Sequence, residues 1–82
     1  MMSEADIKKS IDLYNEGLIY AKKNDFKSAE ELYLQAIELN SEFFQAHYNL
    51  GNIYKNSGKL NKAIKFYQKS IEIKSDFINA YF

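Results

Sequence analysis

Cysteine and proline are both absent from this chain of 82 residues. Without cysteine, neither disulfide bonds nor thiol chemistry is possible, and a cytoplasmic setting is the default expectation. Histidine occurs once, at His47, and no cysteine–histidine cluster or glycine-rich loop is present. The residues that general base catalysis, zinc binding and phosphate binding most often require are therefore missing. We expect a protein that is not an enzyme and that uses no metal ion or other cofactor.

Arginine is missing as well, and all eleven basic residues are lysine. Lysine lacks the planar fork with which arginine binds phosphate in a bidentate manner. Lys62, Lys65 and Lys69 share one helical face, but without arginine or net positive charge they predict a solvated face rather than a nucleic-acid site. No apolar run approaches the ~20 residues of a membrane span, and the polar N-terminus does not resemble a signal peptide. We expect neither nucleic acid nor membrane as a partner.

The net charge of zero hides a division between the two halves of the chain. Residues 10–43 contain seven acidic residues and three lysines, which gives −4, whereas residues 44–77 contain six lysines and two acidic residues, which gives +4. One interpretation is two ordinary solvated surfaces. The other is electrostatic complementarity between the ends of neighbouring molecules.

Residues 10–43 and 44–77 are two copies of one 34-residue unit. Eleven positions are identical at this offset, among them the pairs Tyr14/Tyr48 and Gly17/Gly51. A repeat of this length indicates a stacked architecture in which each unit contacts its neighbours. Such folds mostly bind other proteins.

Capping residues and apolar periodicity predict four helices joined by short loops, so consecutive helices should be antiparallel. The predicted helices cover about residues 4–23, 27–39, 42–57 and 61–74. We expect Ser3 and Ser41 to cap the first and third helices, and Ser75 to cap the tail that follows the fourth. Asn24 and Gly58 tolerate the left-handed conformation that ends a helix. On the first helix, Ile7, Ile11, Tyr14, Leu18 and Ala21 form one continuous apolar stripe.

The second copy reads His47-x-x-Leu50-Gly51-x-x-Tyr54, followed by Ala63-x-x-x-Tyr67. This pattern resembles the tetratricopeptide repeat (TPR), and the resemblance covers residues 10–77. It implies an all-α fold, a right-handed stack of antiparallel helix pairs, in a single domain of residues 1–82. Residues 78–82 would begin a third repeat. The family's tryptophan is replaced by Leu13 and His47, and its proline by Ser41 and Ser75.

The small residues have a packing explanation. A glycine inside a helix costs ~1 kcal/mol relative to alanine, so Gly17 and Gly51 are expected to allow close approach of the partner helix. Ala29 and Ala63 would provide the small surface opposite. The remaining volume would be filled by four tyrosines, which we expect in the core: Tyr20, Tyr33, Tyr54 and Tyr67. We expect His47 to be structural.

In the TPR family, the first helix of each repeat lines a concave groove. The residues expected there are Tyr14, Asn15, Leu18, Gln45, Tyr48, Asn49 and Asn52. An asparagine amide matches both the C=O and the N–H of a peptide backbone, and Asn15 and Asn49 resemble two rungs of the asparagine ladder of TPR domains in protein O-glycosyltransferases. We therefore predict a non-catalytic module that binds a protein or peptide, although ordinary solvation of a polar face would give the same pattern.

Two alternatives remain open. The chain would be the TPR targeting fragment of a larger enzyme, such as a glycosyltransferase, or it would be a self-assembling repeat unit. For self-assembly, we expect an apolar patch at the C-terminal end and most simply a homodimer. The residues assigned to this patch are Ile64, Tyr67, Ile71, Phe77, Ile78, Tyr81 and Phe82.

Overall fold

The computed structural model describes residues 2–79, and the side chains of residues 2–76. The elements are α1 (Glu4–Lys22), α2 (Phe26–Leu39), α3 (Phe44–Asn56) and α4 (Leu60–Asn79). Every regular element in this part of the chain is an α-helix, so the prediction of an all-α fold is confirmed. The chain forms two compact units, Met1–Ser41 and Glu42–Phe82, and each unit is one helix pair. That both units form a single domain stays a prediction.

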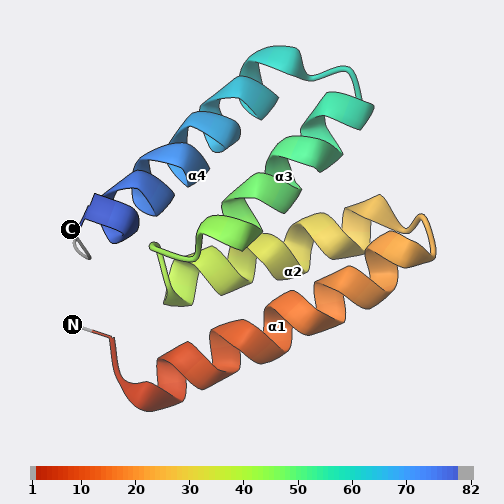
Figure 1. Ribbon diagram of the computed structural model, residues 1–82. Coiled ribbons are helices and arrows are strands. Elements are labelled where there is room, and N and C mark those ends of the chain that lie inside the picture. Colours follow the sequence, from red (N-terminus) through yellow and green to blue (C-terminus); the bar gives the residue numbers. More distant parts are fainter. Residues whose placement is uncertain (1, 80–82) are drawn as a thin grey trace. The chain divides into compact units, whose positions relative to one another are not determined.

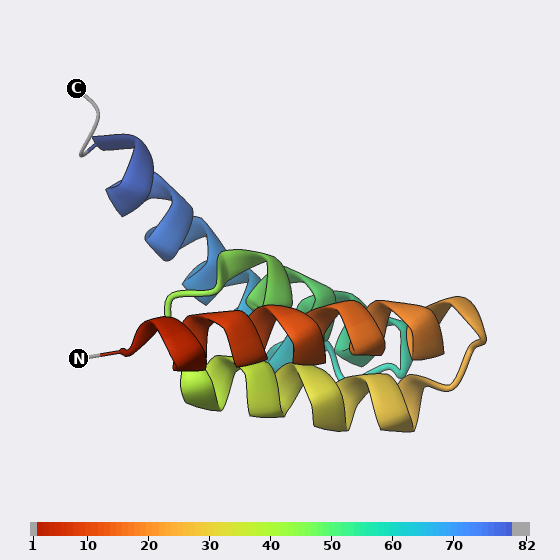
Figure 2. The same ribbon diagram turned by 90° about the horizontal axis from the view of Figure 1, so that it is seen from below.

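In the first unit, α1 and α2 lie side by side and antiparallel (Figures 1 and 2). The Ser3 hydroxyl caps α1 by accepting a hydrogen bond of 3.1 Å from the Asp6 backbone N–H, as predicted. The Asp25 carboxylate caps α2 by accepting from the Ser28 backbone N–H at 3.3 Å. Asn24, in the connection, has φ of +63°, the left-handed conformation expected for it. These local signals end one helix and start the next within a few residues.

In the second unit, α3 and α4 form the equivalent pair (Figure 1). Gly58 reverses the chain between them with φ of +78°, again as expected. Near the other end of the pair, the Ser70 hydroxyl donates a hydrogen bond of 2.9 Å to the Phe44 carbonyl. This contact places the middle of α4 level with the first residue of α3, so the last turns of α4 extend past the start of α3.

Two predicted serine caps are wrong. Ser41 lies in a turn, α3 begins only at Phe44, and its N-cap residue Phe43 provides no side-chain hydrogen bond. Ser75 lies inside α4, which runs on to Asn79 instead of ending near residue 74. Since serine has replaced the helix-ending proline of the family, nothing at that position stops the helix. Lys74 also occupies the position equivalent to Asn40, and lysine favours a helix more than asparagine does.

A glycine facing a tyrosine ring organises the core of each pair. A Cβ atom placed on Gly17 would lie 2.6 Å from Tyr33 Cε1, and one placed on Gly51 would lie 2.6 Å from Tyr67 Cδ1. The close approach predicted for these glycines is therefore confirmed, but the group that fills the space is the tyrosine ring. The alanines that the sequence assigned to this role, Ala29 and Ala63, are also fully buried.

The tyrosines predicted for the core differ in burial. Tyr33 and Tyr54 are only 1% and 2% exposed, whereas Tyr20 and Tyr67 are half-buried. On α1, the most buried positions are Ser10 and Gly17. The isoleucines of the predicted apolar stripe, Ile7 and Ile11, are 39% and 43% exposed, so the stripe is centred away from the core. Close packing at small residues, and not the isoleucine spacing, decides which side of α1 faces α2.

Candidate peptide-binding face of the first helix in each unit

The predicted site residues of the first unit share one face of α1. Asn15 is exposed, and Tyr14 and Leu18 are half-buried on either side of it. The spacing of three and four residues places them on neighbouring turns of one face. Ile11, one turn earlier, extends this face with an apolar side chain that is 43% exposed. The face therefore combines one amide with apolar and aromatic contact area.

The equivalent face of α3 is more polar. Gln45 is exposed, Tyr48 is 52% exposed, and Asn49 and Asn52 are half-buried. Three carboxamides thus lie along three successive turns, beside one aromatic ring. Carboxamides carry both hydrogen-bond donors and an acceptor, so this face suits the alternating groups of a polypeptide backbone.

The tyrosine of each face is held by a tyrosine of the second helix. The ring centroids of Tyr14 and Tyr33 lie 5.6 Å apart, tilted by 40°. Those of Tyr48 and Tyr67 also lie 5.6 Å apart, tilted by 51°. The attraction between two tilted aromatic rings stabilises the position of each ring. Because the glycine three residues after each first-helix tyrosine admits the second ring, the same Tyr-x-x-Gly sequence builds the same pair in both units.

Asn52 also takes part in this arrangement. The Tyr67 hydroxyl donates a hydrogen bond to the Asn52 side-chain oxygen, which connects α4 to the candidate face of α3. The oxygen of Asn52 is therefore engaged within the unit, while its NH2 group can still donate. Leu18 occupies the same repeat position in the first unit, so only Asn15 and Asn49 repeat the amide chemistry in both units.

The Tyr67 phenol gives this contact a pH dependence. Burial away from water, together with the neighbouring Tyr48, raises the pKa of Tyr67 above its ordinary value of 10.0. A raised pKa means that the folded state prefers the neutral phenol. The neutral Tyr67 phenol therefore contributes to the stability of the folded state below about pH 10, and this contribution is lost as the pH rises through the raised pKa.

We therefore expect the free energy of unfolding of the wild type to fall more steeply above about pH 10 than that of Tyr67→Phe, which keeps the ring but cannot ionise. Urea denaturation of both proteins between about pH 8 and about pH 11 measures the difference, and the shared lysine titrations cancel in it. Parallel pH profiles would show that Tyr67 ionises as it does in the unfolded chain.

The residues predicted for self-association fall into three groups. Ile64 and Ile71 are 52% and 64% exposed on α4. Tyr67 instead packs its ring against Gly51 and belongs to the interior of the helix pair. The side chains of Phe77 and Ile78, and all of Tyr81 and Phe82, lie outside the described part of the protein. Sequence reasoning missed Leu60, which is 61% exposed and lies on the same face as the two isoleucines; its spacing of four and eleven residues from them would have revealed it.

His47 is buried, with 6% of its surface exposed. Its ring centroid lies 5.9 Å from that of Phe66, at an angle of 30°. Within residues 2–79, no group of three or more potential metal ligands comes together. Over the same residues, none of the helices combines the length and apolar character of a membrane span.

Comparisons with known proteins agree with this architecture. Residues 44–77 match the sequence profile described as tetratricopeptide repeat, and residues 17–58 match a second profile described as TPR repeat. A solved structure, the crystal structure of MamA, aligns with a TM-score of 0.83 at 24% identity over 85% of this chain. This chain spans 41% of the MamA chain, so it corresponds to less than half of that protein. A search of curated proteins finds no match.

These observations define a helical repeat protein. In each helix pair, small residues allow the two helices to approach closely. The chain belongs to the tetratricopeptide repeat family. The family assignment supports a protein-interaction repeat module, since TPR domains generally bind protein partners.

Proposed function

We propose that this chain is a non-catalytic module that binds an extended polypeptide along the first-helix faces of its two repeats. The contact residues would be Tyr14, Asn15, Leu18, Gln45, Tyr48, Asn49 and Asn52. One observation carries the proposal: both units hold an asparagine beside a tyrosine whose position is set by the same Tyr–Tyr–Gly packing. In the TPR family, successive first helices line one groove, so the two faces would act on one ligand.

The physical basis is backbone recognition. The amides of Asn15 and Asn49 would each hydrogen-bond to a C=O and an N–H of the ligand, which favours an extended chain with little regard to its sequence. Tyr14 and Tyr48 would add apolar contact at a small entropic cost, because each ring is already restrained by its tyrosine partner. Two repeats offer a small area compared with the ~800 Å² per partner of a standard interface, so the affinity should be modest.

The test uses a peptide selected from a random library for binding to the wild type. Asn15→Ala with Asn49→Ala should weaken its affinity about tenfold or more, because each lost hydrogen bond contributes about 0.5–1.5 kcal/mol. Isothermal titration calorimetry measures the change. Gln35→Ala with Asn61→Ala, two exposed carboxamides on the second helices α2 and α4, serves as the matched control. Equal affinities of the two double variants would reject the proposal.

Self-assembly is the second candidate function, favoured by the exposure of Leu60, Ile64 and Ile71. All three are more than half exposed, at 61%, 52% and 64%. They form an apolar row along α4, which we call the α4 apolar row. Such a row suits a two-fold dimer, in which the same surface of each copy pairs with its symmetry mate. The TPR targeting fragment of a larger enzyme, such as a glycosyltransferase, remains a third candidate.

A further inference from the structure

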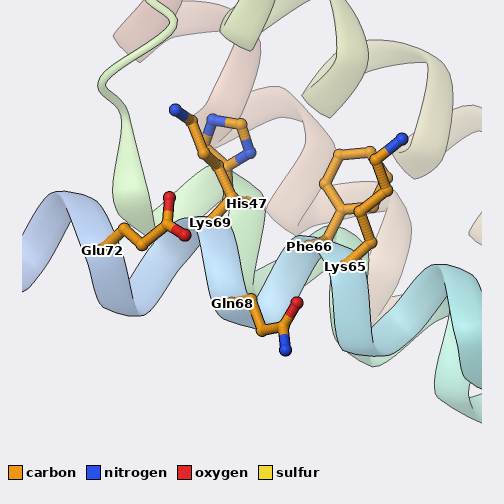
Figure 3. A pocket seen from close by; sticks show the side chains of 6 residues that line it. All are labelled: His47, Lys65, Phe66, Gln68, Lys69 and Glu72. Atoms are coloured by element: carbon orange, nitrogen blue, oxygen red, sulfur yellow. The ribbon is translucent and has the colours of Figure 1, made fainter.

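A cavity of about 330 Å³ opens in the second unit on the side of α4 that carries lysines. Its lining comes from α3 and α4 (Figure 3): His47, Lys65, Phe66, Gln68, Lys69 and Glu72. We call this cavity the His47 pocket. Its volume lies at the lower end of the range for ligand sites, enough for one large or two small side chains.

The inner part of the His47 pocket is aromatic. His47 is 6% exposed and Phe66 is half-buried, with their ring centroids 5.9 Å apart. Phe66 also packs against the Tyr54 ring at 5.4 Å, so it is held from two sides. A rigid aromatic wall provides contact area to the apolar stem of a ligand without much loss of conformational freedom.

The rim of the His47 pocket is charged and exposed. Lys65 and Lys69 lie one turn apart on α4, and Glu72 follows on the next turn. Figure 3 shows Lys69 and Glu72 near His47 and Lys65 near Phe66, whereas the Gln68 side chain points away from the His47 ring. The rim therefore carries two positive charges against one negative charge, within a repeat whose net charge is +4. This balance favours an anion with a single charge.

The residue types narrow the choice of anion. Arginine is absent, and Glu72 would repel a doubly charged phosphate, so the rim suits a carboxylate better. The two ammonium groups supply donors, while Phe66 and His47 accommodate methylene groups. A glutamate side chain has this combination of an apolar stem and a terminal carboxylate.

We propose that the His47 pocket binds the carboxylate of a glutamate side chain presented by a partner polypeptide. This rests on the proposed function, in that the glutamate belongs to a bound polypeptide. The asparagine contacts would bind a polypeptide with little regard to its sequence. The pocket would add a preference for segments that contain glutamate. The two lysines form exposed ion pairs with the carboxylate, so the selectivity is moderate and falls with added salt.

The probes are two short peptides, acetyl-Leu-Glu-Leu-amide and acetyl-Leu-Gln-Leu-amide, which differ by one charge. His47 is the only histidine, so its ring Cε1–H proton gives the only signal of that type, and this signal reports on the pocket. We expect the glutamate peptide to shift this signal saturably and to bind about fivefold more tightly than the glutamine peptide, the effect of two exposed ion pairs. Lys65→Gln with Lys69→Gln should abolish this difference.

The control removes two lysines of the same repeat away from the pocket, Lys55→Gln with Lys59→Gln, and should keep the preference for glutamate. The proposal would be overturned if the wild type bound the two peptides equally, or if the His47 signal did not shift. An equal effect of both lysine pairs would also overturn it, because it would show attraction by overall charge alone. Inorganic phosphate that shifts His47 as strongly as the glutamate peptide would contradict the choice of a carboxylate.

The same spectra keep the two proposals apart. In one outcome, both peptides shift the Asn15 and Asn49 amides, but the His47 signal shows no preference for the glutamate peptide. This outcome would support the proposed function and reject the pocket. In the other outcome, the His47 signal shows a preference for the glutamate peptide, but the Asn15 and Asn49 amides do not shift. This outcome would reject the peptide-binding faces instead.

Discussion

Replacing Gly51 by leucine should lower the free energy of unfolding by more than ~2 kcal/mol, because it overpacks a close helix contact. Even a methyl group at Gly51 would meet Tyr67 Cδ1 and Cε1 at 2.6 Å. The melting temperature should fall by about 10 °C or more, since ~1 kcal/mol corresponds to about 4–8 °C in a domain of this size. Circular dichroism during thermal unfolding measures it.

The equivalent change at Gly17 should cost more. Its partner ring, Tyr33, is 1% exposed and has no room to move, whereas the half-buried Tyr67 can partly swing outward. The expected order of stability is therefore wild type, then Gly51→Leu, then Gly17→Leu. Asn56→Leu, an exposed change near the end of α3, is the control and should stay close to the wild type.

A double variant tests the contact itself. If Gly51→Leu destabilises by colliding with the tyrosine ring, then adding Tyr67→Ala should restore part of the lost stability. The coupling between the two sites should exceed ~0.5 kcal/mol, as expected for residues in direct contact. Strictly additive effects, or a Gly51→Leu protein that melts with the wild type, would contradict the packing derived for the second unit.

The second large effect concerns association through the α4 apolar row. We expect the wild type to dimerise, and Ile64→Asp with Ile71→Asp to raise the dimer dissociation constant about 100-fold or more. Burying one isoleucine contributes about 1.5–3 kcal/mol, and each substitution acts twice in a two-fold dimer. Because both side chains are more than half exposed, the folded monomer should lose little stability.

Sedimentation equilibrium over a range of protein and salt concentrations measures this association. Asn56→Asp with Asn61→Asp introduces the same two charges at exposed polar positions and should leave the dimer intact. An apolar dimer survives added salt, whereas a head-to-tail contact between the −4 and +4 repeats would weaken as charges are screened. A monomer at every concentration up to the millimolar range would reject both modes of association.

Much of the fold follows from residues whose effect is local. The 34-residue period, the Ser3 cap and the left-handed residues Asn24 and Gly58 predicted the helix pairs correctly. The serines at positions 41 and 75 predicted caps that the protein does not use. After Ser41 the chain continues to Phe43 before α3 begins, and α4 runs through Ser75 because serine does not stop a helix as proline does. Local sequence thus located the helices well but not the end of α4.

The candidate site was predictable only as a set of residues on common faces. Periodicity placed Tyr14, Asn15 and Leu18 together on α1, and the repeat pattern predicted Tyr67 in the core. Neither could show that the Tyr67 hydroxyl bonds to Asn52. The His47 pocket was likewise hidden, because it depends on which residues of α3 and α4 face each other across the pair. Contacts between helices depend on side-chain volumes in three dimensions, and one-dimensional spacing does not contain them.

The central claim is that a bound polypeptide contacts the first helix of each repeat. The most direct measurement is the map of backbone amide chemical shifts upon titration with a library-selected peptide. We predict saturable shifts that cluster on α1 and α3 around Tyr14, Asn15, Tyr48, Asn49 and Asn52, and that disappear in the Asn15→Ala, Asn49→Ala protein. Shifts confined to the lysine-bearing face of α4, with α1 and α3 unchanged at saturation, would contradict the claim.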